Sequence, residues 1–233
     1  MAENMGFLLR VKYVKQGRLA FLSHLETIRS MERIIRRAQL PYAITEGFNP
    51  HMKVSFGPAL PCGAAGMGEY LDLRMRDYMK PQEALERMRR ASVPDLAPVA
   101  CDYIDVRADA VTVAFPISDW EATFSAADAS ALQGAFAQLS EQGYIEVLRK
   151  NKKRKRGPME VKRIELEGRL AGEPLVGQAD DGAVTVRFST VAQEQGASLR
   201  PDRYIEQALA FLPEDERPAM ASLVRTALRK AGE

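Results

Sequence analysis

Metal-ligating side chains are scarce in this sequence of 233 residues. It contains two cysteines, Cys62 and Cys101, and two histidines, His24 and His51. An iron–sulfur cluster is usually held by three or four thiolates and a structural zinc ion by four ligands, so neither site is expected in this chain. Two cysteines are also too few for a disulfide framework. We therefore expect two free thiols, no metal site and no cofactor.

Long apolar runs are absent as well. No segment approaches the roughly 20 apolar residues of a membrane-spanning helix, and the N-terminal residues do not form a hydrophobic signal region. The composition, 46% hydrophobic and 27% charged, is ordinary for a globular protein. We expect a cytoplasmic protein without a membrane partner, and the length suits one large domain or two small ones.

Positive charge is concentrated in one short run. The formal net charge is only +2, but residues 149–156 (R-K-N-K-K-R-K-R) hold seven of the 33 basic residues and no acid. Such a run attracts a phosphate backbone and releases its counterions, which predicts salt-dependent, sequence-independent RNA binding. The alternative is a solvated loop without a partner. The predicted RNA-binding residues of this run are Arg149, Lys150, Lys152, Lys153, Arg154, Lys155 and Arg156.

A capped amphipathic helix is predicted after residue 23. Ser23 and Glu26 fit a capping box, and Pro41 ends the helix. The predicted core stripe consists of Ile28, Met31, Ile35 and Ala38. The opposite face carries Arg29, Arg33, Arg36 and Arg37. We predict these arginines as further RNA contacts, with a solvated face paired to neighbouring glutamates as an equally good alternative.

Both histidines lie between residues 23 and 56, the most distinctive stretch of the sequence. His24 and His51 could act as general base and general acid in metal-free RNA cleavage. Alternatively, His24 is a core-side histidine near the helix start, since it precedes Ile28 by four residues. Asn49-Pro50-His51 is equally well explained as a turn. Both interpretations stay open, and no catalytic residue is assigned.

The order of the predicted elements indicates an α+β fold. The first half contains strands and helices in the order β-α-β-β-α-β, the split arrangement of a ferredoxin-like fold with one antiparallel sheet. The expected elements are a strand over 7–14, the capped helix, β-prone segments at 42–45 and 53–56, a strand over 69–75, a helix over 81–91 and an extended segment over 93–104. The stretch from Gly57 to Gly68 is predicted to be irregular.

The second half repeats this order incompletely. The expected elements are strands over 110–116, 144–148, 160–170 and 183–189, and helices over 126–142, 201–212 and 218–231. We therefore predict two tandem ferredoxin-like units, the second degenerate. The first would cover residues 1–106, with the basic helix and the Asn-Pro-His segment. The second would cover residues 107–233, with a basic hairpin loop at 149–158.

The chain resembles a bacterial family of uncharacterised radical-SAM-linked, or radical-SAM-associated, proteins. The motif residues that carry this resemblance are Ser23, His24, Glu26, Asn49, Pro50, His51, Glu69 and Tyr70. It implies a domain fused to, or encoded beside, a radical SAM enzyme that itself holds the iron–sulfur cluster. The chain is also similar, more weakly, to CRISPR repeat-processing endoribonucleases, which are tandem ferredoxin-like proteins, although their terminal glycine-rich motif is not found here.

Together these patterns predict a non-catalytic RNA-binding accessory protein. It would act with a separate radical SAM enzyme in RNA modification or processing. One alternative is a metal-free endoribonuclease that uses His24 and His51. Another is a protein–protein adaptor that does not bind nucleic acid. The oligomeric state stays open.

Overall fold

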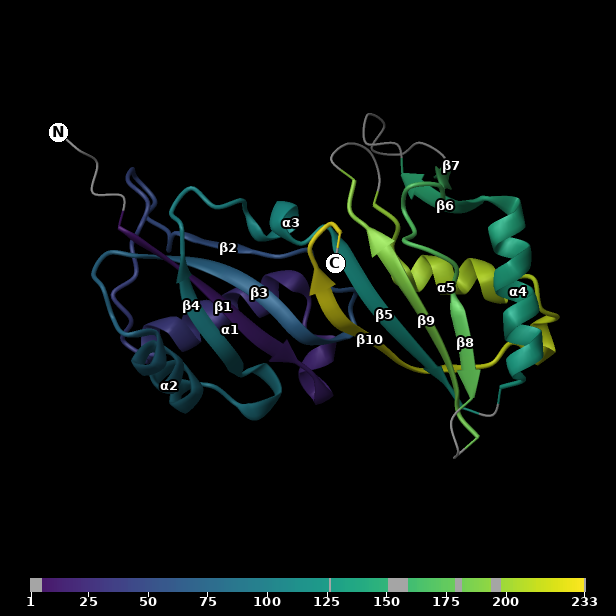
Figure 1. The fold of residues 1–233 in the computed structure, drawn as a ribbon, viewed down its shortest axis with the longest axis horizontal. Coiled ribbons are helices and arrows are strands. Elements are labelled where there is room, and N and C mark those ends of the chain that lie inside the picture. The colour runs from purple at the N-terminus through teal and green to yellow at the C-terminus, as the bar shows by residue number, and fades with distance from the viewer. Residues whose placement is uncertain (1–5, 126, 151–158, 179–181, 194–197, 233) are drawn as a thin grey trace. The chain divides into compact units, whose positions relative to one another are not determined.

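A computed structural model describes residues 6–125, 127–150, 159–178, 182–193 and 198–232. Of Arg149 and Lys150 it describes the backbone alone. Within these ranges the chain forms ten strands and five α-helices, and it divides into two compact units (Figure 1). One unit comprises Met1–Pro116 with Val224–Glu233, and the other comprises Ile117–Leu223. The predicted α+β class is confirmed.

The first unit is built on a mostly antiparallel sheet. Its strands are β1 (Phe7–Lys15), β2 (Val54–Phe56), β3 (Ala65–Met75), β4 (Pro98–Ile104) and the second half of β10 (Met220–Arg229). Strand β1 lies between β3 and β4, and β2 pairs with residues 71–73 of β3, all antiparallel. Strand β10 runs parallel to β3, with Val224 opposite Ala65.

Two helices share the core of this unit. They are α1 (His24–Arg37) and α2 (Pro81–Ala91), and short 3-10 helices η1 (Gly17–Phe21) and η2 (Pro94–Leu96) flank β1 and β4. Alternate residues of β1 and β3 point inward, as period-2 patterning requires. The core includes Leu9, Val11, Leu71 and Leu73 of the sheet, Met31 and Ile35 of α1, and Met88 of α2. Both helices therefore pack on one face of the sheet.

Helix α1 begins as its sequence predicts. The Ser23 hydroxyl accepts a hydrogen bond from the Glu26 backbone N–H, and the Glu26 carboxylate accepts one from the Ser23 N–H at 2.8 Å. This capping box satisfies two N–H groups that have no partner inside the helix. After Arg37 the chain leaves the helix, and Gln39 takes a positive φ of 53° before Pro41.

The second unit contains a three-stranded antiparallel sheet and a separate hairpin. The sheet has the order β5 (Ile117–Phe124), β9 (Val184–Val191), β8 (Leu175–Gln178), and the hairpin consists of β6 (Tyr144–Lys150) and β7 (Met159–Glu165). Helices α4 (Ala129–Gln142) and α5 (Pro201–Leu209) complete the unit, with a short 3-10 helix η3 (Glu214–Glu216). Asp128 caps α4, and Gly143 ends it with a left-handed φ of 76°.

Two predicted elements have the wrong secondary structure. The strand predicted over 110–116 is a single helical turn, α3 (Val111–Ala114), and the strand starts only at Ile117. Tertiary contacts fix this turn, because Val111 is buried and the ring of Phe115 stacks on Tyr70 with centroids 4.7 Å apart. The helix predicted over 218–231 is strand β10. Its alanines and leucines favour a helix locally, but pairing with β3 overrides that propensity.

Three smaller expectations also differ from the structure. Strand β8 lies between the strands expected over 160–170 and 183–189, where no strand is predicted, and strand β3 begins at Ala65, inside the stretch predicted to be irregular. The boundary expected near Arg107 corresponds to a division after Pro116, and the last ten residues belong with the first unit. Among the described residues, no helix is both long enough and apolar enough to cross a membrane.

Candidate functional site

The β6–β7 hairpin is the element that carries the basic run. The two strands pair antiparallel from Tyr144 opposite Glu165 to Lys150 opposite Met159. Residues 151–158, which connect them, lie outside the described part of the chain, and so do Lys152, Lys153, Arg154, Lys155 and Arg156. The described strands end at Lys150 and begin again at Met159, on either side of that connection. The role of the basic side chains themselves stays a prediction.

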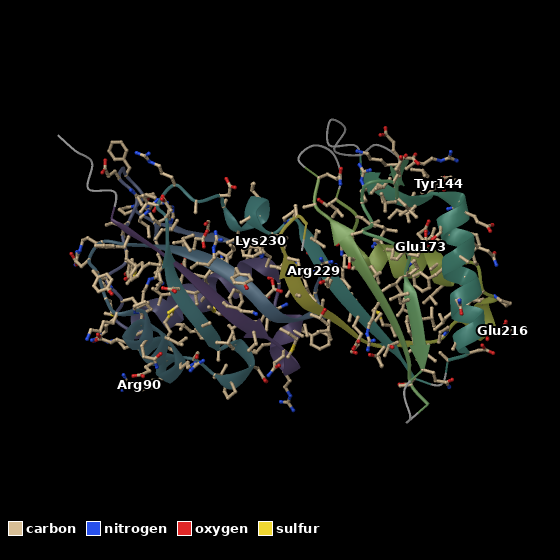
Figure 2. The ribbon with its side chains drawn as sticks, in the orientation of Figure 1. Arg90, Tyr144, Glu173, Glu216, Arg229 and Lys230 are labelled. Carbon is tan, nitrogen blue, oxygen red and sulfur yellow. The ribbon has the colours of Figure 1, made fainter. Side chains whose placement is uncertain are left out.

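The two faces of this hairpin differ. On one face, Ile145 and Ile164 are buried and anchor the base of the hairpin in its unit. On the other face, Leu148 and Val161 lie directly opposite each other, and their exposed fractions are 64% and 59%. Tyr144, labelled in Figure 2, lies under the guanidinium of Arg163, 4.3 Å from its ring centroid. The hairpin is thus a ribbon with apolar side chains open to solvent near the basic run.

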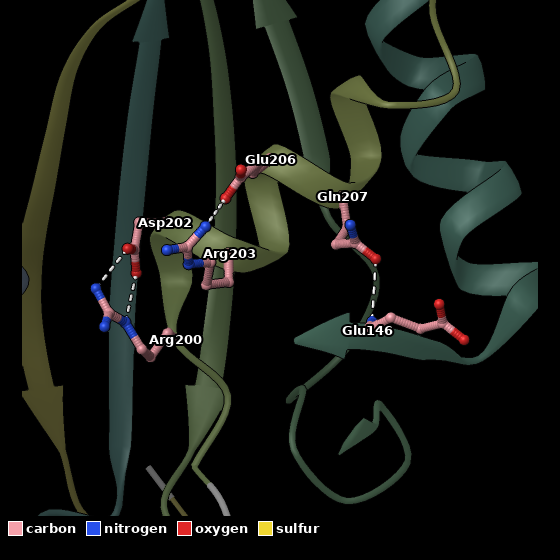
Figure 3. A network of polar contacts seen from close by, with 6 residues as sticks. All are labelled: Glu146, Arg200, Asp202, Arg203, Glu206 and Gln207. Atoms are coloured by element: carbon pink, nitrogen blue, oxygen red, sulfur yellow. Dashed lines mark hydrogen bonds and ion pairs between the residues drawn. The ribbon is translucent and has the colours of Figure 1, made fainter. Parts of the chain in front are cut away.

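A hollow of about 1080 Å³ separates this ribbon from helix α5. Its lining residues from the hairpin are Ile145, Glu146, Val147, Leu148, Met159, Lys162 and Ile164, and those from the α5 region are Ser198, Arg200, Arg203, Glu206 and Gln207. Figure 3 shows the polar contacts at its edge, where the Gln207 side-chain oxygen accepts a hydrogen bond from the Glu146 N–H at 3.0 Å. That bond ties β6 to α5.

Two arginines of the hollow are held by acidic neighbours. Arg200 donates two hydrogen bonds to Asp202, of 3.1 Å and 2.6 Å, and Arg203 donates one to Glu206. Both pairs join residues two or three apart and are drawn in Figure 3. Lys162, by contrast, forms no ion pair with any carboxylate in the described ranges. The lining of the hollow therefore combines three cations and two carboxylates, Glu146 and Glu206, with apolar side chains.

The four arginines predicted on the outer face of α1 lie where the sequence places them. Arg29, Arg33, Arg36 and Arg37 are all exposed. Arg36 pairs with Glu32, one helical turn away, at 3.0 Å. Exposed pairs of this type contribute little stability. The structure thus accommodates the solvated-face alternative, and RNA contact by these arginines stays a prediction.

His24 lies against the core side of α1. Its half-buried ring meets the ring of Phe56 edge-on, with centroids 6.3 Å apart. It lines a small hollow of about 10 Å³ together with Lys15 and Glu69. Burial, followed by the positive charges of Arg225 and Lys15, lowers the pKa of His24 below its usual value of 6.5, and Glu69 opposes this shift. At neutral pH the imidazole is therefore uncharged.

The lowered pKa of His24 makes stability depend on pH in a defined direction. The unfolded chain binds a proton at this residue more readily, so the free energy of unfolding should fall as the pH drops through about 6.5. We expect the His24→Gln variant to show a weaker fall between about pH 7 and pH 5. Urea unfolding at both pH values measures this. NMR titration of the wild type should also give His24 a pKa below 6.5, with its signal identified by comparison with the His24→Gln variant. A pKa above 6.5 would contradict the argument that burial lowers it.

His51 occupies a different environment. It is exposed, its backbone N–H donates to the Thr45 hydroxyl at 2.9 Å, and its carbonyl accepts from the Thr45 N–H at 2.8 Å. These bonds close the loop that contains Asn49 and Pro50, as the turn interpretation predicts. Within the described residues no hydrogen bond or ring contact joins His51 to His24. The structure gives no sign that the two histidines act as a catalytic pair.

A buried charge cluster in the first unit was missed by the sequence analysis. Arg225 of β10 donates to the Glu69 carboxylate from Nε at 2.9 Å and from Nη2, and Nη2 also donates to the Pro58 carbonyl at 2.6 Å. The two side chains are only 2% and 4% exposed. Lys15, also buried, donates to the Ala20 carbonyl at 2.7 Å, and burial lowers its pKa. The Glu69 carboxylate thus pairs with buried Arg225, and it also raises the pKa of nearby Lys15 without contacting it.

A signal for this cluster exists in the sequence. Glu69 shares the inward-facing parity of Leu71, Leu73 and Met75 on β3, so a charge stands at a core position. Gly66 makes room for it, because a Cβ there would lie 2.4 Å from the Glu69 carboxylate. The partner, Arg225, could not be found in this way because its segment was predicted as a helix.

The two cysteines are free and lie apart in the first unit. The Cys62 thiol is exposed and donates to the Phe21 carbonyl, and the half-buried Cys101 thiol donates to the Pro81 carbonyl. Burial raises the pKa of Cys101 to about 11, so it is protonated at neutral pH. No group of three potential metal ligands is found among the residues that the structure describes.

Comparison with known proteins identifies a family but no activity. No curated protein matches the chain. Among solved structures it is similar to a chain of the crystal structure of a Cbf5-Nop10-Gar1 complex, with a TM-score of 0.46 and 12% identity over 96% of this chain. The present chain spans 49% of that one, and a likeness this weak supports no functional argument. A family model matches residues 8–201, and the chain therefore belongs to the DUF2344 family, described as an uncharacterized protein conserved in bacteria.

Proposed function

We propose that this chain is an RNA-binding accessory protein whose affinity comes chiefly from the β6–β7 hairpin and its basic run. The supporting observation is the register of the hairpin, which pairs Lys150 with Met159 and leaves the run as the connection between two strands. The exposed pair Leu148 and Val161 adds apolar surface beside it. A charged run on an ordered ribbon attracts phosphates without requiring a particular base sequence.

The partner that we propose is a separate radical SAM enzyme. This rests on the sequence resemblance described above, together with the small number of thiols in the chain. The RNA complex would bring substrate to that enzyme in RNA modification or processing. Co-purification of the two proteins tests the association directly.

We also propose that both units are variants of the ferredoxin-like fold. In the first unit the elements follow the order β1-α1-β2-β3-α2-β4, with antiparallel pairing of β1 to β3, β1 to β4 and β2 to β3. In the second unit the order is β5-α4-β8-β9-α5, with the β6–β7 hairpin inserted after α4. The hairpin would then be an addition to the ferredoxin-like fold, and added surface segments commonly carry binding residues.

Replacing the five basic residues from 152 to 156 with serine should remove most of the salt dependence of RNA binding. About four phosphate contacts on single-stranded RNA correspond to a slope of log K against log salt near −3, and the serine variant should lie close to zero. Fluorescence anisotropy with bulk cellular RNA at several salt concentrations measures this. The matched control replaces Arg29, Arg33, Arg36 and Arg37 on α1, and we expect a much smaller change.

Other outcomes favour the alternatives. Equal binding by wild type and serine variant, or no binding at low salt, would overturn the proposal in favour of a protein–protein adaptor. Cleavage of structured RNA in the presence of a chelator, lost in His24→Ala, would instead favour the endoribonuclease.

A further inference from the structure

The hollow between the ribbon and α5 has the dimensions and the chemistry of a ligand site. Small-molecule sites measure about 300–1,000 Å³ and combine an apolar wall with a few polar groups. Here the apolar side chains of Ile145, Val147 and Ile164 lie on one face of the ribbon, and the charged lining consists of the cations Lys162, Arg200 and Arg203 and the carboxylates Glu146 and Glu206. Three cations against two carboxylates leave the lining with one positive charge in excess, which fits an anion that carries a flat apolar group.

We propose that this hollow binds one unstacked nucleotide of a single-stranded RNA, an inference that rests on the RNA binding proposed above. The base lies against the apolar wall of the ribbon, and the phosphate faces Lys162, Arg200 and Arg203. Recognition of single-stranded RNA commonly places splayed bases on aromatic rings or on guanidinium planes. The lining residues include no aromatic ring, so in this hollow the base packs on aliphatic side chains instead.

The ion pairs of the hollow preorganise these arginines. A guanidinium has five N–H donors, and Asp202 engages two of those of Arg200, which leaves three for a ligand. Glu206 holds Arg203 in the same way through a single donor. Fixing the planes before binding reduces the entropy lost on association. Lys162, with no acidic partner in the described ranges, supplies the uncompensated charge.

The position of the hollow connects it to the basic run. Its lining residues Leu148 and Met159 lie next to Arg149 and Lys150 on the paired strands. A strand of RNA held by its phosphates along the run can therefore deliver a nucleotide into the hollow. The run contributes affinity without base contacts, whereas the hollow makes binding depend on the presence of a base.

An abasic oligonucleotide separates the two contributions. The probes are a fluorescent octamer of uridylate and an octamer with the same backbone in which the central nucleotides lack bases. Because packing of one base contributes about 1–3 kcal/mol to binding, wild type should bind the intact octamer about tenfold more tightly than the abasic octamer. Val147→Trp, which fills the hollow, should bring this ratio close to one while keeping the salt slope. Lys162→Met removes a phosphate contact, so it should weaken the binding of both octamers and make the salt slope shallower by about 0.7.

The matched control is Arg187→Met, which removes an exposed cation of the same unit outside the lining of the hollow. Its ratio of intact to abasic affinity should equal that of wild type, and circular dichroism checks that each variant folds. Equal binding of both octamers by wild type, with a steep salt slope, would overturn the nucleotide site and leave the proposed function standing. Loss of binding to both octamers at low salt would overturn the proposed function as well.

Discussion

Replacing Glu69 with glutamine is expected to lower the free energy of unfolding by about 3–5 kcal/mol, because the change removes the carboxylate that pairs with the buried guanidinium of Arg225. Arg225 and Lys15 both lie in the interior around Glu69, and neither reaches bulk water. Arg225→Met should cost less than Glu69→Gln, since Glu69 would still have Lys15 nearby. Urea unfolding followed by far-ultraviolet circular dichroism measures both changes.

A double variant and a surface pair provide the controls. Glu69→Leu combined with Arg225→Met removes both charges, and it should be clearly more stable than the Glu69→Gln single variant. Arg203→Ala breaks the exposed pair with Glu206 and should change stability by at most about 1 kcal/mol. A loss of similar size in Arg203→Ala and Glu69→Gln would mean that burial does not set the strength of these pairs.

The second large effect is expected in the core of the other unit. Phe136→Ala should lower the free energy of unfolding by about 3–5 kcal/mol, because it opens a cavity among packed rings. Phe136 is buried and contacts Tyr204, with ring centroids 5.4 Å apart, and Tyr204 in turn contacts Phe188 at 5.0 Å. The protein has a single tryptophan, Trp120, in the same core, so its fluorescence reports the unfolding of this unit.

Tyr204→Phe is the matched control for this prediction. Within the described residues the Tyr204 hydroxyl is the buried side-chain polar atom without a hydrogen-bond partner, and burial raises its pKa. Removing that hydroxyl keeps the ring contacts and ends the desolvation cost, so stability should stay within about 1 kcal/mol of wild type or rise. A large loss in Tyr204→Phe would show that the hydroxyl has a partner in solution.

The parts of the fold that the sequence predicted correctly have local causes. The start of α1 depends on Ser23 and Glu26, three residues apart, and the end of α4 depends on Gly143 alone. Strand β1 is predicted by the alternation of inward-facing and outward-facing side chains within its nine residues. The same holds for the hairpin, since the basic run is flanked by the two strands that pair across it.

The candidate site was predictable in part. The basic run and the arginines of α1 are visible as charge patterns in the sequence. The hollow beside the ribbon was not, because Lys162 on β7 and Arg203 on α5 are separated by 40 residues of chain and meet only through folding. Of the two interpretations left open for His24 and His51, the catalytic one stays untested, since a shared stretch of sequence does not by itself place two side chains together.

The sequence by itself determined the α+β class, the capped helix, the ribbon and the concentration of positive charge, because each depends on residues close together in the chain. The tertiary structure decided that residues 220–229 form a strand, that residues 111–114 form a helical turn, and that Arg225 lies against Glu69 across 156 residues. Strand pairing and burial of a charge depend on a partner that local propensity does not reveal. For these segments the energy gained from distant contacts exceeds the few tenths of a kcal/mol per residue that separate local preferences.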